Sequence, residues 1–349
     1  MKFLIQIFII LVIFLKTETL LSDNNLFNVN NIELEKKDKD TNNDIANAAI
    51  KKGYNLLIKR ILLKEDYDII SNLNFSLIKQ LIKYYQISEI SNNKNNKKLL
   101  KFSITFDKDK IHDLFYEKGI SYSDILDKEL YILPIFISDS ELFIFNNNFF
   151  YKNWNEVYKN DLLEFILPTE NIETIQKINN SKNYLIDINI EDLFKEYSNK
   201  NLALVLIEDK KIESIKIYIK TFIQGKNISK SIKFNKKDLS NNDESYIQII
   251  SYTKKELINL VKSENLIDIR TPYFLNAKLD LDQKSNVVEL NLKIKNIDLI
   301  ENLYVQELNK DYMKIRIKYL GKLNKIIKQL KREKIELKLV NDQWIIKTL

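Results

Sequence analysis

The chain has 349 residues, of which 45% are hydrophobic and 30% charged, so it is long enough for two or three globular domains. It contains no Cys and a single His, which excludes disulfides, thiol catalysis and the usual Cys- and His-ligated zinc sites. The formal net charge is +7, and residues 301–349 carry most of it, with 12 Lys and Arg against 6 Asp and Glu.

The first residues have the order of a bacterial secretory signal. Lys2 precedes an apolar run from Phe3 to Leu15, and polar residues follow. The run is shorter than the ~20 apolar residues that a helix needs to span a bilayer. We therefore expect residues 1–22 to be a signal peptide, with an uncleaved N-terminal anchor as the alternative. We expect no other membrane span.

Residues 24–122 are expected to form a small α+β domain that begins with a long helix. Thr41 followed by Asp44 is a plausible helix start. The helix places one apolar stripe on a single face, made of Ile45, Ala49, Gly53, Leu57 and Ile61. Because Gly53 lowers helix stability, its place on this stripe predicts a structural role, the close approach of another backbone.

The rest of this domain reads as a second helix, a hairpin and a third helix. We expect a helix over 77–84, strands over 84–91 and 98–106 joined by a polar loop, and a helix that ends at Gly119. His112 lies on that last helix. As a general base it would need a partner that the sequence does not identify, so we predict a partly exposed structural residue.

Residues 123–268 are expected to form a central α/β domain. The run 202–207 is continuously apolar, as in a strand covered on both faces, whereas 212–222 alternates apolar and polar residues. A strand interrupted by Pro134, a helical stretch with Trp154 and a closing helix over 246–263 complete the pattern. Strands that alternate with helices indicate a layered structure.

Residues 272–349 are expected to form a C-terminal domain. The pattern reads as strand 287–294, helix 297–303, strands 304–308 and 312–319, helix 322–332 and strands 335–340 and 343–347. This order is βαββαβ with one extra strand, a ferredoxin-like plait. The first strand would turn one face inward with Val288, Leu290, Leu292 and Ile294, and Trp344 would cover the end of the sheet. The fold class is therefore α+β with α/β parts, in three small domains.

The C-terminal segment also resembles a known family. A hydrophobic and aromatic step into a Gly, followed by a helix, a strand, a turn and a Trp, is similar to the end of the bacterial family called domain of unknown function 2066. The matching positions are Tyr319, Leu320, Gly321, Leu330 and Trp344. The resemblance implies an exported protein of the Gram-negative periplasm, structural roles for Gly321 and Trp344, and no catalytic residue to transfer.

A basic face is the main candidate for binding. Lys314, Arg316 and Lys318 share one side of a predicted strand, and Glu289, Asn291 and Lys293 would lie on its neighbour. Ferredoxin-like sheets that bind RNA need exposed aromatic rings on their central strands, whereas Tyr312 and Tyr319 lie at the ends of this one. We therefore favour a solvated face over a nucleic-acid site.

No motif predicts catalysis or a cofactor. The segment "DLDQKSNVVE" lacks the Gly and Glu that a calcium loop requires, so it reads as a turn, and the four glycines form no phosphate-binding loop. The sequence predicts a non-catalytic, exported envelope protein that needs no cofactor or metal and contacts another envelope protein. Two alternatives stay open: a periplasmic hydrolase with a carboxylate pair, and a nucleic-acid-binding protein that uses the basic C-terminal domain.

Overall fold

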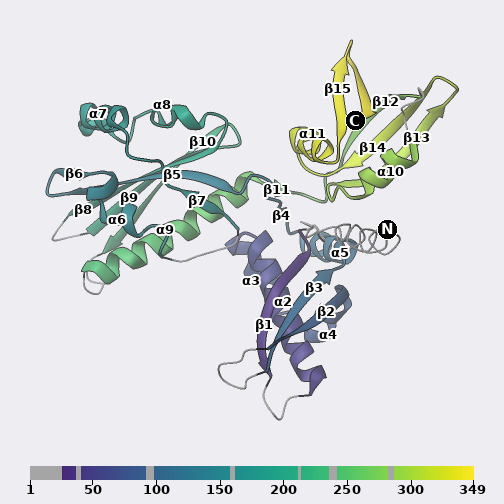
Figure 1. Cartoon of the computed structure of the whole chain (residues 1–349), viewed down its shortest axis with the longest axis horizontal. Helices are drawn as coiled ribbons and strands as arrows, with labels where there is room; N and C mark the ends of the chain where they lie inside the picture. The colour runs from purple at the N-terminus through teal and green to yellow at the C-terminus, as the bar shows by residue number, and fades with distance from the viewer. Residues whose placement is uncertain are drawn as a thin grey trace, which may run out of the picture. The chain divides into compact units, whose positions relative to one another are not determined.

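The computed structural model describes residues 26–36, 41–91, 98–157, 162–210, 214–235, 242–281 and 287–349. The predicted signal segment, the hairpin loop after residue 91 and residues 282–286 of the predicted turn "DLDQKSNVVE" lie outside these residues. The chain forms two compact units, one made of residues 1–122 and 266–349 and the other of residues 123–265. The first and last predicted domains therefore share one unit, and the central domain forms the other. The structure has the predicted mixture of helices and strands, an α+β fold (Figure 1).

The N-terminal segment of the first unit packs a long helix against a three-stranded antiparallel sheet of order β1-β3-β2. Its elements are β1 (Asn28–Lys36), α2 (Asn42–Ile61), α3 (Lys64–Ile70), α4 (Phe75–Gln80), β2 (Ile82–Ser91), β3 (Lys98–Phe106) and α5 (Lys108–Lys118). The hairpin of β2 and β3 and the helix α5 are as predicted. The sequence reading missed β1 and extended the helix α4 into β2.

Local chemistry explains where the helices of this segment begin and end. Thr41 and Asp44 form a capping box at the start of α2, in which each side chain accepts a backbone N–H of the other residue. Asp107 caps α5 by accepting the N–H groups of Asp109 and Lys110. Gly119 ends α5 with φ of 66°, as predicted for a C-terminal glycine.

Gly53 lies where the helix α2 meets the sheet. A Cβ at this position would lie 2.8 Å from Cδ1 of Ile104 and 2.9 Å from Cδ1 of Ile32. The predicted close approach is therefore real, but two isoleucine side chains make it and not a backbone. The sequence could not distinguish these cases because both require the absence of a Cβ.

The second unit is a six-stranded mixed sheet of order β10-β9-β8-β5-β6, with β7 beside β5. Helix α9 covers one face with Ile249, Ile250 and Leu257, and the segment from α7 to η3 covers part of the other. The elements are β5 (Glu129–Ser138), β6 (Glu141–Phe143), η1 (Phe145–Asn147), α6 (Phe149–Asn153), β7 (Glu164–Ile166), α7 (Ile172–Asn180), η2 (Lys182–Tyr184), α8 (Ile190–Leu193), η3 (Lys195–Tyr197), β8 (Asn201–Lys210), β9 (Ser214–Ile223), β10 (Lys226–Asn235) and α9 (Asn242–Glu264).

Strand β8 confirms the prediction for the apolar run 202–207. It lies in the middle of the sheet, parallel to β5 and antiparallel to β9, and its residues from Asn201 to Ile207 are all buried. Trp154 follows α6 and is completely buried. Short strands β4 (Tyr122–Ser123) and β11 (Leu266–Ile267) pair where the chain enters and leaves the second unit.

The C-terminal segment is a βαββαβ arrangement with one further strand, as predicted. Its elements are β12 (Tyr273–Asp280), α10 (Val287–Lys295), β13 (Ile300–Leu308), β14 (Tyr312–Tyr319), α11 (Leu323–Arg332), β15 (Ile335–Val340) and β16 (Gln343–Thr348). The strand order is β13-β14-β12-β16-β15. The extra strand β16 runs parallel to β12 and antiparallel to β15, and so lies between the first and fourth strands of the plait.

The assignment of the first half of this plait was wrong. Residues 287–294 form the helix α10 and not a strand. The prediction failed because the apolar residues of this run fit both the two-residue period of a strand and the 3.6-residue period of a helix. Leu290 and Ile294 are one helical turn apart and buried, whereas Val288 and Leu292 are 68% and 60% exposed. The true first strand is β12. Of the predicted helix 297–303, residues 297–299 lie in the turn after α10 and the rest begin β13.

No helix in the described part of the chain is long and apolar enough to cross a membrane.

Candidate functional site

The sheet of the C-terminal segment has one apolar and one polar face. The residues Met313, Ile315, Ile317 and Tyr319 of β14 are buried, as predicted, in a core shared with Leu290 of α10 and Ile326 of α11. The alternate residues point to the opposite side. We call that side the open face, and its members on the first three strands are Phe274, Asn276, Lys278, Asp280, Asn302, Tyr304, Glu307, Tyr312, Lys314, Arg316 and Lys318.

Arg316 lies at the centre of the open face. It is opposite Asn276 on β12 and opposite Tyr304 on β13. Its guanidinium carbon lies 4.2 Å from the centroid of the Phe274 ring, a cation–π contact. Phe274 is 49% exposed and Tyr304 47% exposed, so both rings are accessible beside the cation.

The lysines of the open face are paired with carboxylates. The Nζ–carboxylate distances are 2.7 Å for Lys314 and Glu307, 2.7 Å for Lys318 and Glu301, and 2.6 Å for Lys278 and Asp280. The hydrogen bond that Lys314 donates to Glu307 raises the pKa of Lys314, and the one that Lys318 donates to Glu301 raises the pKa of Lys318. The positive charges of the three lysines are therefore balanced by neighbouring carboxylates, whereas the guanidinium of Arg316 contacts an aromatic ring.

The structure brings the three predicted basic residues together but changes their surroundings. Glu289, Asn291 and Lys293, expected on the adjacent strand, lie on the helix α10, where Glu289 pairs with Lys293 at 2.8 Å. The sequence reading missed Phe274 and Tyr304. A signal for the strand β12 was available in the sequence, because apolar residues alternate there with Phe274, Asn276 and Lys278. The apolar residues are Leu275, Ala277 and Leu279, and the alternation would have placed the ring of Phe274 on the outer face.

Gly321 and Trp344 have structural positions. Gly321 follows β14 with φ of 79°, a conformation that favours glycine. Trp344 lies opposite Leu339 on β15, as predicted, and opposite Ala277 on β12. It is partly buried at the margin of the core, so it is less enclosed than the sequence suggested.

His112 is buried, with 8% of its surface exposed, which contradicts the predicted exposure. Its ring lies 5.6 Å from that of Phe27 and 5.3 Å from that of Tyr122. Its Nε2 has no hydrogen-bond partner among the described residues. Burial, reinforced by the charge of Lys108, lowers the pKa of His112 to about 4. A neutral imidazole packed between rings is suited to a structural role.

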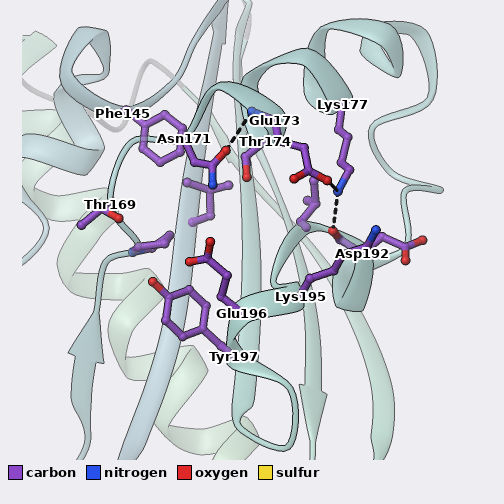
Figure 2. A pocket seen from close by; sticks show the side chains of 13 residues that line it. Phe145, Thr169, Asn171, Glu173, Thr174, Lys177, Asp192, Lys195, Glu196 and Tyr197 are labelled. Carbon is purple, nitrogen blue, oxygen red and sulfur yellow. Dashed lines mark hydrogen bonds and ion pairs between the residues drawn. The ribbon is translucent and has the colours of Figure 1, made fainter.

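A solvent-open hollow in the second unit gathers several carboxylates. Figure 2 shows Glu173 and Lys177 on one side and Glu196 with Tyr197 on the other. Glu173 pairs with Lys177 at 2.7 Å, and this bond, together with Lys195, lowers the pKa of the Glu173 carboxyl. A general acid needs a raised pKa, so Glu173 is not suited to that role. No group of three or more His, Asp or Glu in the described residues could hold a metal ion.

The comparisons with known proteins assign no family. No family model and no curated protein matches the chain, so the resemblance to the domain of unknown function 2066 stays a prediction. One solved structure, titled "Crystal structure of uncharacterized protein", is 10% identical and covers 40% of this chain and 94% of its own. Its TM-score of 0.19 is too low to support an inference about fold or function.

Proposed function

We propose that this chain is a non-catalytic protein of the bacterial envelope that binds another protein through the open face of its C-terminal sheet. The observation that carries the proposal is the contact between Arg316 and Phe274, with Tyr304 on the neighbouring strand. Arg and aromatic side chains are enriched among the residues that dominate the energy of protein interfaces. Here they lie together and exposed on a five-stranded sheet.

The charge of the open face supports a protein partner over a nucleic acid. Nucleic-acid binding draws most of its affinity from cations that replace the counterions of phosphates. Glu301, Glu307 and Asp280 already pair with three of the four cations of the open face. A phosphate backbone would have to displace these carboxylates, whereas a protein surface with its own mixed charges can complement them.

The location in the envelope rests on the first residues of the chain, which lie outside the described part. The charged start and the short apolar run are the reasons to propose export. The family resemblance is consistent with a periplasmic home in a Gram-negative bacterium. It supplies no partner, so the partner's identity has to come from the open face itself.

The proposal is tested by charge reversal at the centre of the open face. We expect affinity capture from native envelopes to retain a partner protein on the wild-type chain and to lose it with Arg316→Glu. Lys331→Glu is the matched control, because Lys331 is an exposed cation on α11, outside the open face. Equal retention by all three proteins would contradict the proposal.

The same proteins distinguish the nucleic-acid alternative. The anisotropy of a labelled single-stranded RNA, titrated with each protein at about physiological salt, measures this binding directly. We expect no saturable change for the wild type. Tight binding that falls steeply with salt and is lost with Arg316→Glu would assign the open face to nucleic acid.

A further inference from the structure

We propose that the edge strand β2 pairs with β2 of a second copy of this chain, antiparallel and centred on Gln86. The pairing would join two three-stranded sheets into one sheet of six strands. It involves a different surface from the open face of the C-terminal segment, so it stands independently of the proposed function.

The apolar face of the three-stranded sheet is unevenly covered. Ile32 on β1, Phe102 on β3 and Ile87 on β2 form one row across the sheet. The first two side chains are 1% exposed, whereas Ile87 is 46% exposed. The next row repeats the pattern, since Val29 and Ile104 are 5% and 1% exposed but Tyr85 is 43% exposed.

These rows lie on the face that the helix α2 covers, because Ile104 and Ile32 contact Gly53 of that helix. Residues directly opposite one another on paired strands share a face of the sheet. Tyr85 and Ile87 are therefore a continuation of the buried face, left bare where the helix no longer reaches. A second copy could cover this strip without any rearrangement of the first.

The backbone of β2 is also available on one side. The strand pairs with β3 and has no strand on its other edge within the described chain. Proteins usually protect such an edge with several charges, a proline, a β-bulge or a very short strand. From Lys83 to Glu89 the strand has one cation, one anion, no proline and two exposed tyrosines, Tyr84 and Tyr85. A bulge lies at its start, between Ile82 and Tyr84, and the register with β3 is regular from Tyr84 onward. These features suit an edge that pairs.

The sequence of β2 complements itself, which selects a second copy as the occupant. In an antiparallel pair centred on Gln86, the amide of Gln86 faces the same amide of the other copy. Tyr85 lies opposite Ile87, an aromatic beside a β-branched side chain, and Tyr84 lies opposite Ser88. Lys83, at the bulge that begins the strand, would come near Glu89 of the other copy, so opposite charges would meet at both ends of the pair. The two-fold axis repeats each contact.

Disulfide trapping tests the register. Directly opposite residues of antiparallel strands have Cα atoms roughly 4.5–5.5 Å apart, within the range of a disulfide. Because the chain has no Cys, Gln86→Cys introduces a single thiol. We expect mild oxidation of the full-length variant to give a covalent dimer in high yield. Ser88→Cys is the matched control on the same strand, where the two thiols would be roughly 13 Å apart.

Charge reversal tests the same pairing without a covalent bond. We expect the full-length chain to sediment as a dimer, and Lys83→Glu or Glu89→Lys to weaken the dimer at least about tenfold. The double variant Lys83→Glu/Glu89→Lys restores opposite charges and is expected to restore the dimer. A monomeric wild type, equal cross-linking at positions 86 and 88, or a double variant no better than the singles would each overturn the proposal.

Discussion

At the scale of single residues, burial explains both His112 and Gly53. His112, on the helix α5, packs its imidazole between the rings of Phe27 and Tyr122, and the absent Cβ of Gly53 makes room for two isoleucines. Each residue depends on a partner distant in sequence, Phe27 for the His and Ile104 for the Gly. The helical pattern showed that Gly53 was buried, but no local signal showed that His112 was.

His112 predicts a pH-dependent stability. Its folded pKa of about 4 lies below the ~6.5 of an unfolded chain, so the unfolded state binds more protons between these values. The free energy of unfolding should therefore fall as pH falls, by about 2 kcal/mol between pH 7 and pH 5. Urea unfolding at both pH values measures the loss. His112→Phe should remove this part of the pH dependence, and an unchanged slope would contradict the assignment.

Gly53→Ala is expected to destabilise the protein although alanine favours helices. The gain in helix propensity is about 1 kcal/mol, whereas overpacking a buried contact costs about 1–3 kcal/mol. We predict that Gly53→Ala lowers the free energy of unfolding by about 1 kcal/mol, measured by thermal or urea unfolding. The loss should be smaller when Gly53→Ala is made in the Ile104→Val variant, which lacks the nearest methyl. Ala48→Gly, at an exposed position of α2, is the control and should lose about 1 kcal/mol through propensity alone. A stabilised Gly53→Ala would refute the packing argument.

At the scale of elements, helix ends and strongly periodic segments could be predicted from the sequence. The strand β14, the helix α5 and its terminal glycine each have one dominant period or stop signal. The segment over 287–294 fits both the helical and the strand period. The choice between helix and strand there depends on contacts with residues distant in the sequence. Missing the strand β12 hid Phe274, and with it the aromatic half of the candidate site.

The capping box of α2 gives a prediction at this scale. Thr41 accepts the N–H of Asp44 at 3.2 Å, and the Asp44 carboxylate accepts both the N–H and the hydroxyl of Thr41. These bonds with Thr41 lower the pKa of Asp44. Thr41→Ala should therefore cost about 1 kcal/mol in urea unfolding, and Thr41→Ser, which keeps the hydroxyl, should cost much less. An equal cost for both variants would show that the hydroxyl is not responsible.

At the scale of the whole molecule, the chain is two compact units, and the two ends of the sequence contribute to the same one. The sequence predicted domain boundaries after residue 122 and between residues 268 and 272. It could not show that the segments on either side of the second unit belong together, since that depends on contacts across more than a hundred residues.

Export is the prediction that concerns the whole chain. Residues 1–25 fused to a reporter that is active only in the periplasm should give activity, because Lys2 and the run from Phe3 to Leu15 have the layout of a signal. Replacing Ile9 and Ile10 with Asp interrupts the apolar run and should abolish the activity. A silent reporter with the unmodified segment would contradict the proposed export to the envelope.

Photo-crosslinking in living cells tests whether the open face binds a protein. A photoreactive amino acid at Tyr304 should give a discrete adduct with one protein, and Arg316→Glu in the same chain should abolish it. The same amino acid at Tyr116, a 63% exposed tyrosine on the helix α5, is the control and should give none. No adduct at position 304, an adduct removed by nuclease, or identical adducts at positions 304 and 116 would contradict the binding of a protein at the open face.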